Sequence, residues 1–155
     1  MQISELMTKR VRTCRMDERC STAAKLMWDG DCGDVPVVDP HDRLCGIITD
    51  RDICMAALHQ GLPISDIPVA SAMASRVAAC SPTDSVSAAL EIMRERRVRR
   101  IPVVDADRRV VGVLSQGDLV VAASLPGARK EAELTPDNII RALASISTQR
   151  REAHA

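Results

Sequence analysis

The stretch that decides the fold is Asp34-Val35-Pro36-Val37-Val38-Asp39, which returns 66 residues later as Arg100-Ile101-Pro102-Val103-Val104-Asp105. The same register needs no gap anywhere between residues 3–53 and residues 69–119. A gapless register of this length indicates an internal duplication. The chain therefore contains two copies of one structural unit.

Each copy predicts the same order of elements from its apolar pattern and its turn residues. In the first copy these are an extended stretch at 11–14, a helix at 21–28, strands at 35–38 and 44–49, and a helix at 50–58. Ser21 and Asp50 are the expected N-caps of the two helices, which end near Gly30 and Gly61. In the second copy they are a helix at 85–96, strands at 101–104 and 110–115, and a helix at 118–123.

The predicted fold class is α/β (α+β), with two pseudo-symmetric βαββα units packed sheet to sheet and a C-terminal helix. The expected boundaries are 1–62 for the first repeat, 63–124 for the second, and 125–155 for a polar linker and an amphipathic helix. Each repeat is too small to bury its apolar sheet face alone. Thr135-Pro136 is a strong helix start, and the periodicity continues to about Gln149. This pattern alone leaves open whether the helix packs on its own domain or forms a dimer contact.

Composition and charge exclude several classes of protein. The 155 residues carry 21 basic and 21 acidic side chains, so no global field attracts nucleic acid or anionic lipid. No apolar run approaches the length of a membrane span. The N-terminal residues do not resemble a signal peptide, and we expect a cytoplasmic protein. We expect no nucleic-acid partner and no membrane association.

The cysteines and histidines do not form a recognisable metal or redox motif. No C-x-x-C pair occurs, and the chain has three histidines. We therefore expect no metal site and reduced thiols that behave as small buried hydrophobes. Cys14 and Cys80 hold equivalent places in the two copies, so their proximity, and with it a redox role, is an open question. The six cysteines are Cys14, Cys20, Cys32, Cys45, Cys54 and Cys80.

The repeated motifs together resemble the CBS domain family, in the tandem arrangement called a Bateman module. Each copy has an apolar-Pro-Val-Val-Asp strand, a turn, and then a glycine, two apolar residues, and a Thr or Ser three positions before an Asp. The second motif reads Gly46-Ile47-Ile48-Thr49-Asp50-Arg51-Asp52 and Gly112-Val113-Leu114-Ser115-Gln116-Gly117-Asp118. The resemblance covers residues 3–121. It implies CBS units and a regulatory adenosine-containing ligand, namely AMP, ADP, ATP or S-adenosylmethionine, with no other cofactor required.

The Thr/Ser-x-x-Asp motif has chemistry that is intelligible without the family. Thr49 and Ser115 place a hydroxyl beside the free N–H groups that begin a helix, where a phosphate or ribose oxygen can bind. Asp52 and Asp118 follow one helical turn later, and a carboxylate can accept both hydroxyls of a ribose. The alternative is that these side chains only cap the helix and favour its dipole.

The resemblance also implies that adenine lies between the start of each unit and the residues around the Pro-Val strand. The alternative for the strand positions is ordinary core packing with an edge proline. Carried over, the adenine positions are Thr13, Cys14, Asp34, Val35 and Pro36, with Ala79, Cys80, Arg100, Ile101 and Pro102.

Phosphate contacts are expected to differ between the copies. Arg51 is the candidate in the first, and Arg97 or Arg100 in the second, although the arginines there also fit a solvated helix face. Asp34 places an acid where Arg100 stands in the other copy, which argues against a triphosphate in the first site.

These patterns predict a protein that is not an enzyme, because the scattered histidines assemble no catalytic constellation and no P-loop is present. The favoured function is a regulatory sensor that binds an adenosine ligand and signals through a homodimer. The alternative is a stress-related structural or interaction scaffold whose pocket is empty. The sequence names no downstream protein partner.

Overall fold

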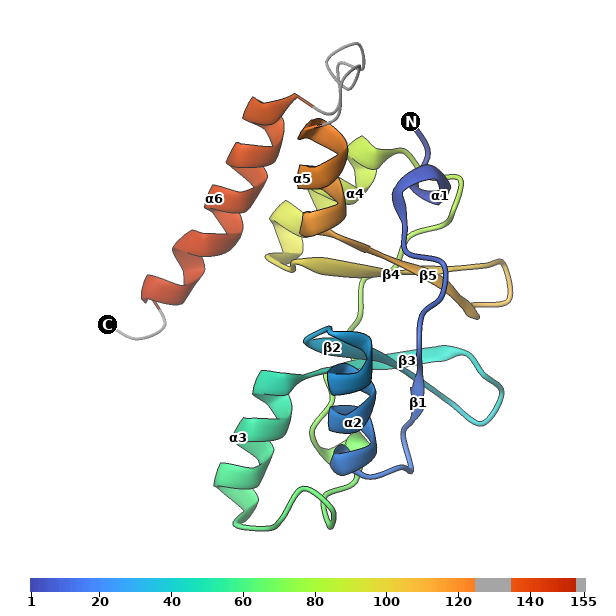
Figure 1. Cartoon of the computed structure of the whole chain (residues 1–155), viewed down its shortest axis with the longest axis vertical. Helices are drawn as coiled ribbons and strands as arrows, with labels where there is room; N and C mark the ends of the chain where they lie inside the picture. Colours follow the sequence, from blue (N-terminus) through green and yellow to red (C-terminus); the bar gives the residue numbers. More distant parts are fainter. Residues whose placement is uncertain (125–134, 153–155) are drawn as a thin grey trace. The chain divides into compact units, whose positions relative to one another are not determined.

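The computed structural model describes residues 1–124 and 135–152, with side chains described as far as residue 147. It contains both helices and strands, as the α/β prediction requires (Figure 1). The predicted linker at 125–134 lies outside the described residues. The elements are α1 (Ile3–Leu6), β1 (Cys14–Arg15), α2 (Cys20–Gly30), β2 (Asp34–Val38), β3 (Leu44–Thr49), α3 (Asp50–Gln60), a 3-10 turn (Val69–Ser71), α4 (Val86–Arg96), β4 (Arg100–Val104), β5 (Val110–Ser115), α5 (Gln116–Ser124) and α6 (Pro136–Glu152).

The described chain divides into two compact units whose boundaries interleave in the sequence. The first-repeat unit consists of residues 11–77 with 107–110. The second-repeat unit consists of residues 1–10 and 78–106 and the described residues from 111 onward. Residues 1–10 thus belong to the second-repeat unit, and residues 63–77 belong to the first-repeat unit.

The first-repeat unit is built on a three-stranded sheet in the order β1-β2-β3. β1 runs parallel to β2 with Cys14 opposite Val37, and β2 runs antiparallel to β3 with Asp34 opposite Thr49. Every residue of β2 is buried, whereas burial alternates along β3. The hydrophobic core of this unit includes Cys14, Cys20, Ala23, Met27, Val35, Val37, Ile48, Ile53, Ile67 and Val69.

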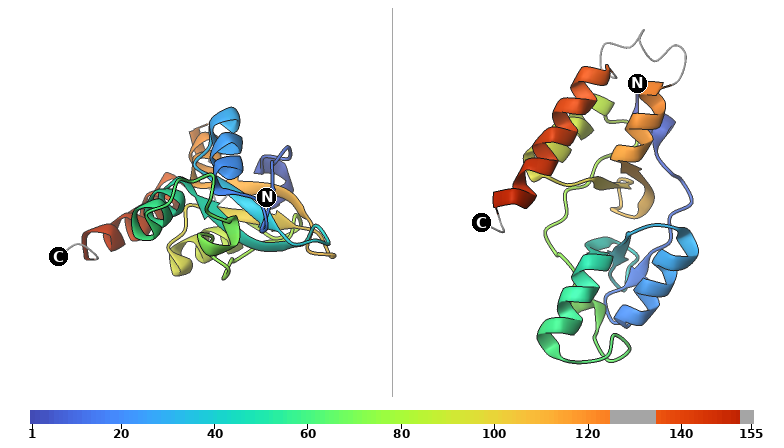
Figure 2. Two further views of the ribbon diagram at one scale, coloured as in Figure 1. Left: turned by 90° about the horizontal axis from the view of Figure 1, so that it is seen from below. Right: turned by 60° about the vertical axis from the view of Figure 1, so that its left-hand side comes forward.

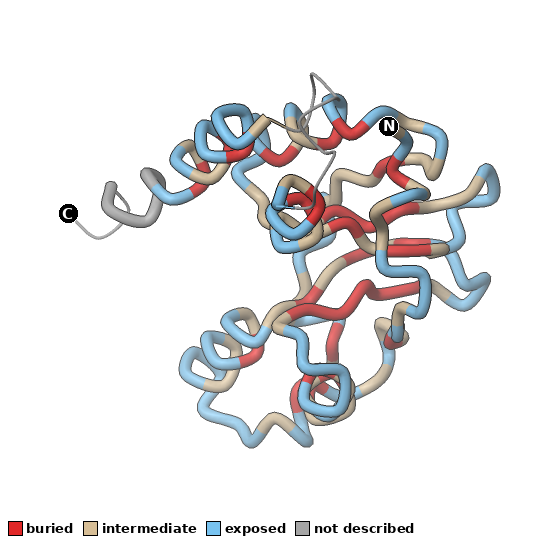
Figure 3. Tube along the Cα trace, turned by 45° about the horizontal axis from the view of Figure 1, so that its top comes forward, coloured by how far each residue is buried: buried red, intermediate tan, exposed pale blue. Residues whose placement is uncertain are grey.

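The second-repeat unit pairs β4 with β5 and adds a parallel bridge between Cys80 and Val103. Its helix α6 lies beside α4 and α5, as two views show (Figures 1 and 2). One side of α6 is buried through Ile139, Ala142 and Ile146, while Ile140 is exposed. The helix therefore packs on its own unit, as the first of the two alternatives predicts. Figure 3 shows the same division elsewhere, with buried residues along the strands and exposed ones on the outer sides of the helices.

A methionine from the other repeat packs against each motif glycine. A Cβ added at Gly112 would lie 2.5 Å from the Sδ of Met7, and one at Gly46 would lie 2.6 Å from the Sδ of Met73. Backbone bridges fix both approaches, between Thr8 and Val113 and between Ile47 and Ala74. Both glycines are thus required by close packing, and each strand pair is completed by a segment from beyond its own repeat.

Two predicted helix caps are wrong by one or two residues. The N-cap of α2 is Arg19 rather than Ser21, because the N–H groups of Cys20 and Ser21 donate to the carbonyls of Ile67 and Ile64 and so extend the helix start. The N-cap of α3 is Thr49 rather than Asp50. Gly61 is confirmed as the C-cap of α3, with φ 64°.

The first predicted strand is largely wrong, because β1 covers Cys14–Arg15 and shares only Cys14 with the expected stretch at 11–14. The remaining strands agree with the prediction to within one residue. The N-cap of α4 is Ser85, whose hydroxyl accepts from the N–H of Ala88, and the hydroxyl of Thr135 accepts from Asn138 at the start of α6.

The duplication extends to unusual backbone conformations. Among the described residues, four non-glycine residues have positive φ: Asp31 at 48°, Arg97 at 54°, Asp42 at 60° and Arg108 at 65°. They form two pairs at the 66-residue shift, one ending α2 and α4 and the other in the turns before β3 and β5. Asp tolerates the left-handed region because its short side chain bonds locally, but arginine has no such compensation.

Candidate functional site: two equivalent strand–helix junctions

The first junction lies where β3 ends at Thr49 and α3 begins at Asp50. The Thr49 hydroxyl donates to Oδ2 of Asp52 at 2.7 Å, and the Thr49 N–H donates to the same oxygen at 2.9 Å. In return, the Asp52 N–H donates to the Thr49 hydroxyl oxygen at 3.1 Å. Both residues are half-buried. The pair forms a reciprocal capping box, which satisfies two backbone donors at the helix start.

The second junction reproduces this geometry at Ser115 and Asp118. The Ser115 hydroxyl and N–H both donate to Oδ2 of Asp118 at 2.7 Å, and the Asp118 N–H donates to the Ser115 hydroxyl oxygen at 3.1 Å. The capping alternative for all four residues is therefore realised in the structure. Among the described residues, Oδ1 of each aspartate accepts no hydrogen bond, so it keeps its capacity to accept from a ligand hydroxyl.

The strand that precedes each junction lies directly beside it. Asp34 is the cross-strand partner of Thr49, and the Asp50 N–H donates to the carbonyl of Gly33 at 3.1 Å. The Gln116 N–H donates in the same way to the carbonyl of Arg99 at 2.9 Å. Residues 33 and 34 thus lie beside residues 50 and 49, and residue 99 lies beside residue 116, whereas the antiparallel register places Val35 and Pro36 opposite Ile48 and Ile47.

The other candidate residues differ in how far they are buried and in what they contact. Val35 and Ile101 are buried in the cores of their units, so core packing accounts for their side chains. Cys14 pairs across from Val37, and Cys80 donates its N–H to the carbonyl of Pro102 at 3.1 Å. The remaining candidates differ in burial: Pro36 and Pro102 are buried, Ala79 and Arg100 are half-buried, and Thr13, Arg51 and Arg97 are exposed.

Burial disfavours the thiolate form of Cys14 and Cys80. Loss of hydration raises the pKa of Cys14 to about 12 and that of Cys80 to about 11, with smaller contributions from Glu18 and Asp84 respectively. A neutral thiol is a poor nucleophile and a poor metal ligand. The expectation of buried thiols is wrong for Cys32 and Cys54, which are exposed. The described residues contain no group of three His, Cys, Asp or Glu side chains able to hold a metal ion.

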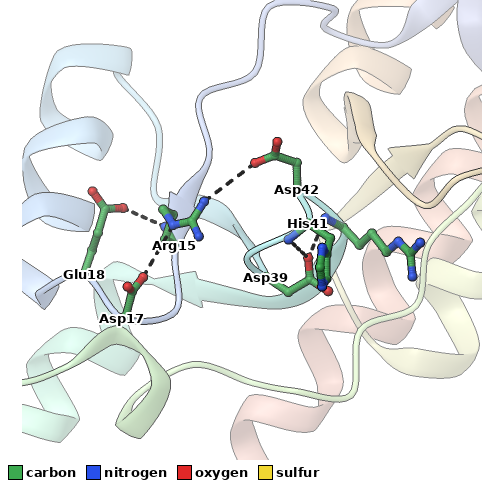
Figure 4. A network of polar contacts seen from close by, with 7 residues as sticks. Arg15, Asp17, Glu18, Asp39, His41 and Asp42 are labelled. Carbon is green, nitrogen blue, oxygen red and sulfur yellow. Dashed lines mark hydrogen bonds and ion pairs between the residues drawn. The ribbon is translucent and has the colours of Figure 1, made fainter.

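A polar network orders the turn between β2 and β3 (Figure 4). Oδ1 of Asp39 accepts from the N–H of His41 at 2.8 Å and from that of Arg43 at 3.0 Å, and the Arg43 bond is the main cause that lowers the pKa of Asp39. The Arg15 side chain lies between Asp17 and Asp42, at 3.6 and 3.9 Å. The network is exposed and shapes the turn rather than the junctions.

Residues at four further positions flank the junctions and were not singled out from the sequence as site residues. They are Gly33 and Asp50 in the first repeat and Arg99 and Gln116 in the second, joined by the two backbone bonds above. A comparison of side-chain charge between residues 66 positions apart would have identified these four positions, because Gly33 corresponds to Arg99 and Asp50 corresponds to Gln116. Their neighbours differ in charge between the repeats although the backbone is the same.

A strand pair followed by a hydroxyl-and-carboxylate box thus occurs twice in the chain with one geometry. A comparison with family models finds the same twofold repeat. The model of the CBS domain matches residues 3–59 and again residues 64–124. The chain belongs to the CBS domain family. Its two matched segments make it a tandem CBS pair.

Individual relatives support the same assignment. The CBS domain-containing protein YhcV of Bacillus subtilis is 33% identical over 119 residues, which cover 77% of this chain and 83% of that protein. The CBS domain pair of MJ0100, solved with 5′-methylthioadenosine and S-adenosyl-L-methionine, has a TM-score of 0.70 at 27% identity and covers 78% of this chain and 94% of its own. PAE2072 from Pyrobaculum aerophilum, solved with AMP, has a TM-score of 0.69 at 26% identity, with coverages of 77% and 90%. None of the described helices is both long and apolar enough to cross a membrane.

Proposed function

We propose that this tandem CBS pair is a non-catalytic regulatory module that binds an adenosine-containing ligand and signals through a homodimer in the cytoplasm. The observation that carries the proposal is the duplicated junction, with a hydroxyl and a carboxylate at the start of a helix in each repeat. Solved CBS pairs of similar fold hold AMP in one case and methylthioadenosine and S-adenosylmethionine in another.

The carboxylates are the proposed ribose contacts. Oδ2 of Asp52 and of Asp118 is occupied by the capping box, which holds each carboxylate in one orientation. Oδ1 then accepts from a ribose hydroxyl without disturbing the cap. The backbone of residues 34–36 and 100–102 supplies the edge along which the base lies, since the Val35 and Ile101 side chains are buried.

Exposed apolar side chains support the homodimer. In the first-repeat unit, Trp28 on α2 is 87% exposed and Leu58 on α3 is 70% exposed. Ala23 and Met27, which lie on the same helix as Trp28, are buried in the core and are not available for a partner. A self-complementary patch closes most simply about a two-fold axis.

A thermal-shift panel tests the ligand, with purified protein and adenosine, AMP, ADP, ATP and S-adenosylmethionine. A ligand at 100 times its Kd stabilises the folded state by about 2.7 kcal/mol, which shifts the melting temperature by several degrees. Asp52→Ala and Asp118→Ala should each weaken calorimetric binding about ten- to a hundredfold at their own junction. Light scattering during gel filtration should give about twice the 16.8 kDa mass of one chain.

The second candidate is a structural or interaction scaffold without a ligand. The observation that favours it is that each capping box is complete without a ligand, so Thr49 and Asp52 have a structural role in any case. If no adenine compound at millimolar concentration shifts the melting temperature, the scaffold replaces the sensor.

A further inference from the structure

The two junctions have one backbone geometry but opposite charge. The residues that flank the first junction in the sequence include four aspartates and one arginine, and those that flank the second include three arginines and one aspartate. We call these sets the acidic half-site and the basic half-site. The acidic half-site consists of Asp31, Asp34, Asp50, Arg51 and Asp52. The basic half-site consists of Arg97, Arg99, Arg100 and Asp118.

The contrast is concentrated on the strand that borders each helix start. Asp34 is only 7% exposed and lies opposite Thr49, where paired Cα atoms are about 5 Å apart. Asp50 is the first residue of α3, and its carboxylate already accepts the N–H of Arg51 at 2.7 Å. A phosphate at this helix start would therefore bind beside two acidic positions, Asp34 on the neighbouring strand and Asp50 in the first turn of the helix.

In the basic half-site the equivalent positions favour a phosphate. Arg100 replaces Asp34 at the start of β4, and the carbonyl of Arg99 accepts from the N–H of Gln116, the first residue of α5. Arg97 precedes Arg100 by three residues, a span of at most about 11 Å. Within the described part of the chain, the side chains of Arg97 and Arg99 form no ion pair or hydrogen bond. They can therefore turn toward a ligand without breaking a contact.

We propose that the two half-sites take different classes of adenosine ligand: the basic one a phosphorylated adenosine, the acidic one an adenosine without phosphate, either neutral or cationic. The inference rests on the proposed function and adds to it the ligand class of each site. A phosphate carries nearly two negative charges at neutral pH, and like charges within a few ångströms at a partly buried site change affinity by about tenfold or more. The shared ribose contact through Asp52 or Asp118 does not discriminate, so the charge of the neighbours decides.

The test uses calorimetry on the full chain with adenosine and AMP as probes, in two variants that each keep one ribose carboxylate. Asp52→Ala leaves the basic half-site intact and should bind AMP at least tenfold more tightly than adenosine. Asp118→Ala leaves the acidic half-site intact and should bind adenosine at least tenfold more tightly than AMP. AMP binding to the basic half-site should also weaken steeply between 50 and 500 mM salt, and adenosine binding should not.

Matched charge variants then separate ligand choice from folding. In the Asp52→Ala protein, Arg100→Gln should weaken AMP binding about tenfold or more and change adenosine binding less than about threefold. In the Asp118→Ala protein, Asp50→Asn should strengthen AMP binding, and because Asp50 is exposed this variant avoids the folding risk of changing buried Asp34. Equal preferences in the two single-site proteins would overturn the inference while leaving the sensor intact. Absence of binding by the unaltered protein would instead remove the proposed function itself.

Discussion

Replacing Gly112 with alanine measures how closely the N-terminal segment approaches β5. The new Cβ would lie 2.5 Å from the Sδ of Met7 and 3.1 Å from the carbonyl oxygen of Thr8, well inside the optimal separation of about 3.5–4.0 Å. The methionine can move. The carbonyl cannot move freely, because Thr8 and Val113 exchange two backbone hydrogen bonds of 3.0 Å each.

The expected size of the effect follows from these contacts. Overpacking of a buried site costs about 1–3 kcal/mol, and the loss of glycine entropy in the unfolded chain returns about 0.4–1 kcal/mol. Gly112→Ala should therefore lower the free energy of unfolding by about 1–2 kcal/mol, or the melting temperature by about 2–8 °C for a chain of this size. Urea unfolding should show a lower midpoint with an unchanged slope.

Gly117→Ala is the matched control. Its Cβ would meet only the Ser115 Oγ at 3.4 Å, an ordinary contact, and the residue lies in the first turn of α5. This variant should leave stability unchanged or raise it by about 0.5–1 kcal/mol. Combining Gly112→Ala with Met7→Ala should cost less than the two single changes added together. Close packing at Gly112 is refuted if Gly112→Ala is as stable as Gly117→Ala, or if the double variant shows simple additivity.

Three further predictions concern other parts of the chain. Ser85→Ala should cost about 1 kcal/mol in urea unfolding because it removes the cap of α4, whereas Ser87→Ala in the same helix should cost less than half of that; equal losses would contradict the capping assignment. Burial raises the pKa of Cys14 to about 12 from an ordinary 9.0. The stability that the protonated Cys14 thiol contributes to the folded state is therefore complete below pH 9 and is lost as the pH rises toward 12. Unfolding free energies measured from pH 8 to 10.5 should fall less steeply in Cys14→Ala than in Cys54→Ala. A chain cut after residue 62 should yield halves that do not fold separately by circular dichroism, because each unit takes a segment from beyond its repeat; a cooperatively folded half would refute this.

Much of the fold could be predicted because its signals are local. The turn at Asp39 and the alternating strand that follows depend on residues within a few positions of one another. Thr49 and Asp52 are three residues apart at a helix start, so their contact follows from the geometry of one helical turn. The left-handed backbone shared by Asp31 and Arg97 shows that the duplication preserved conformation where the side chains diverged.

The candidate site was only partly predictable, because only part of it depends on such local signals. The motif residues were found from their spacing, but Gly33 and Arg99, whose carbonyls accept from the helix starts, immediately precede strands whose register must be known first. The exposure of Cys54 depends on which side of α3 faces the core, and neighbouring Ile53 takes the buried position.

By itself, the sequence determined that the chain is duplicated, that each copy forms strands and helices in one order, and that each ends its second strand in a hydroxyl-and-carboxylate box. Tertiary structure alone decided where α2 begins, since the N–H groups of Cys20 and Ser21 find their acceptors more than 40 residues away at Ile67 and Ile64. It also decided that α6 packs on its own unit and that the segments holding Met7 and Met73 cross the repeat boundary. Local sequence specifies which hydrogen bonds and apolar faces need partners, but several elements offer equivalent partners, and only the packing of the whole chain selects among them.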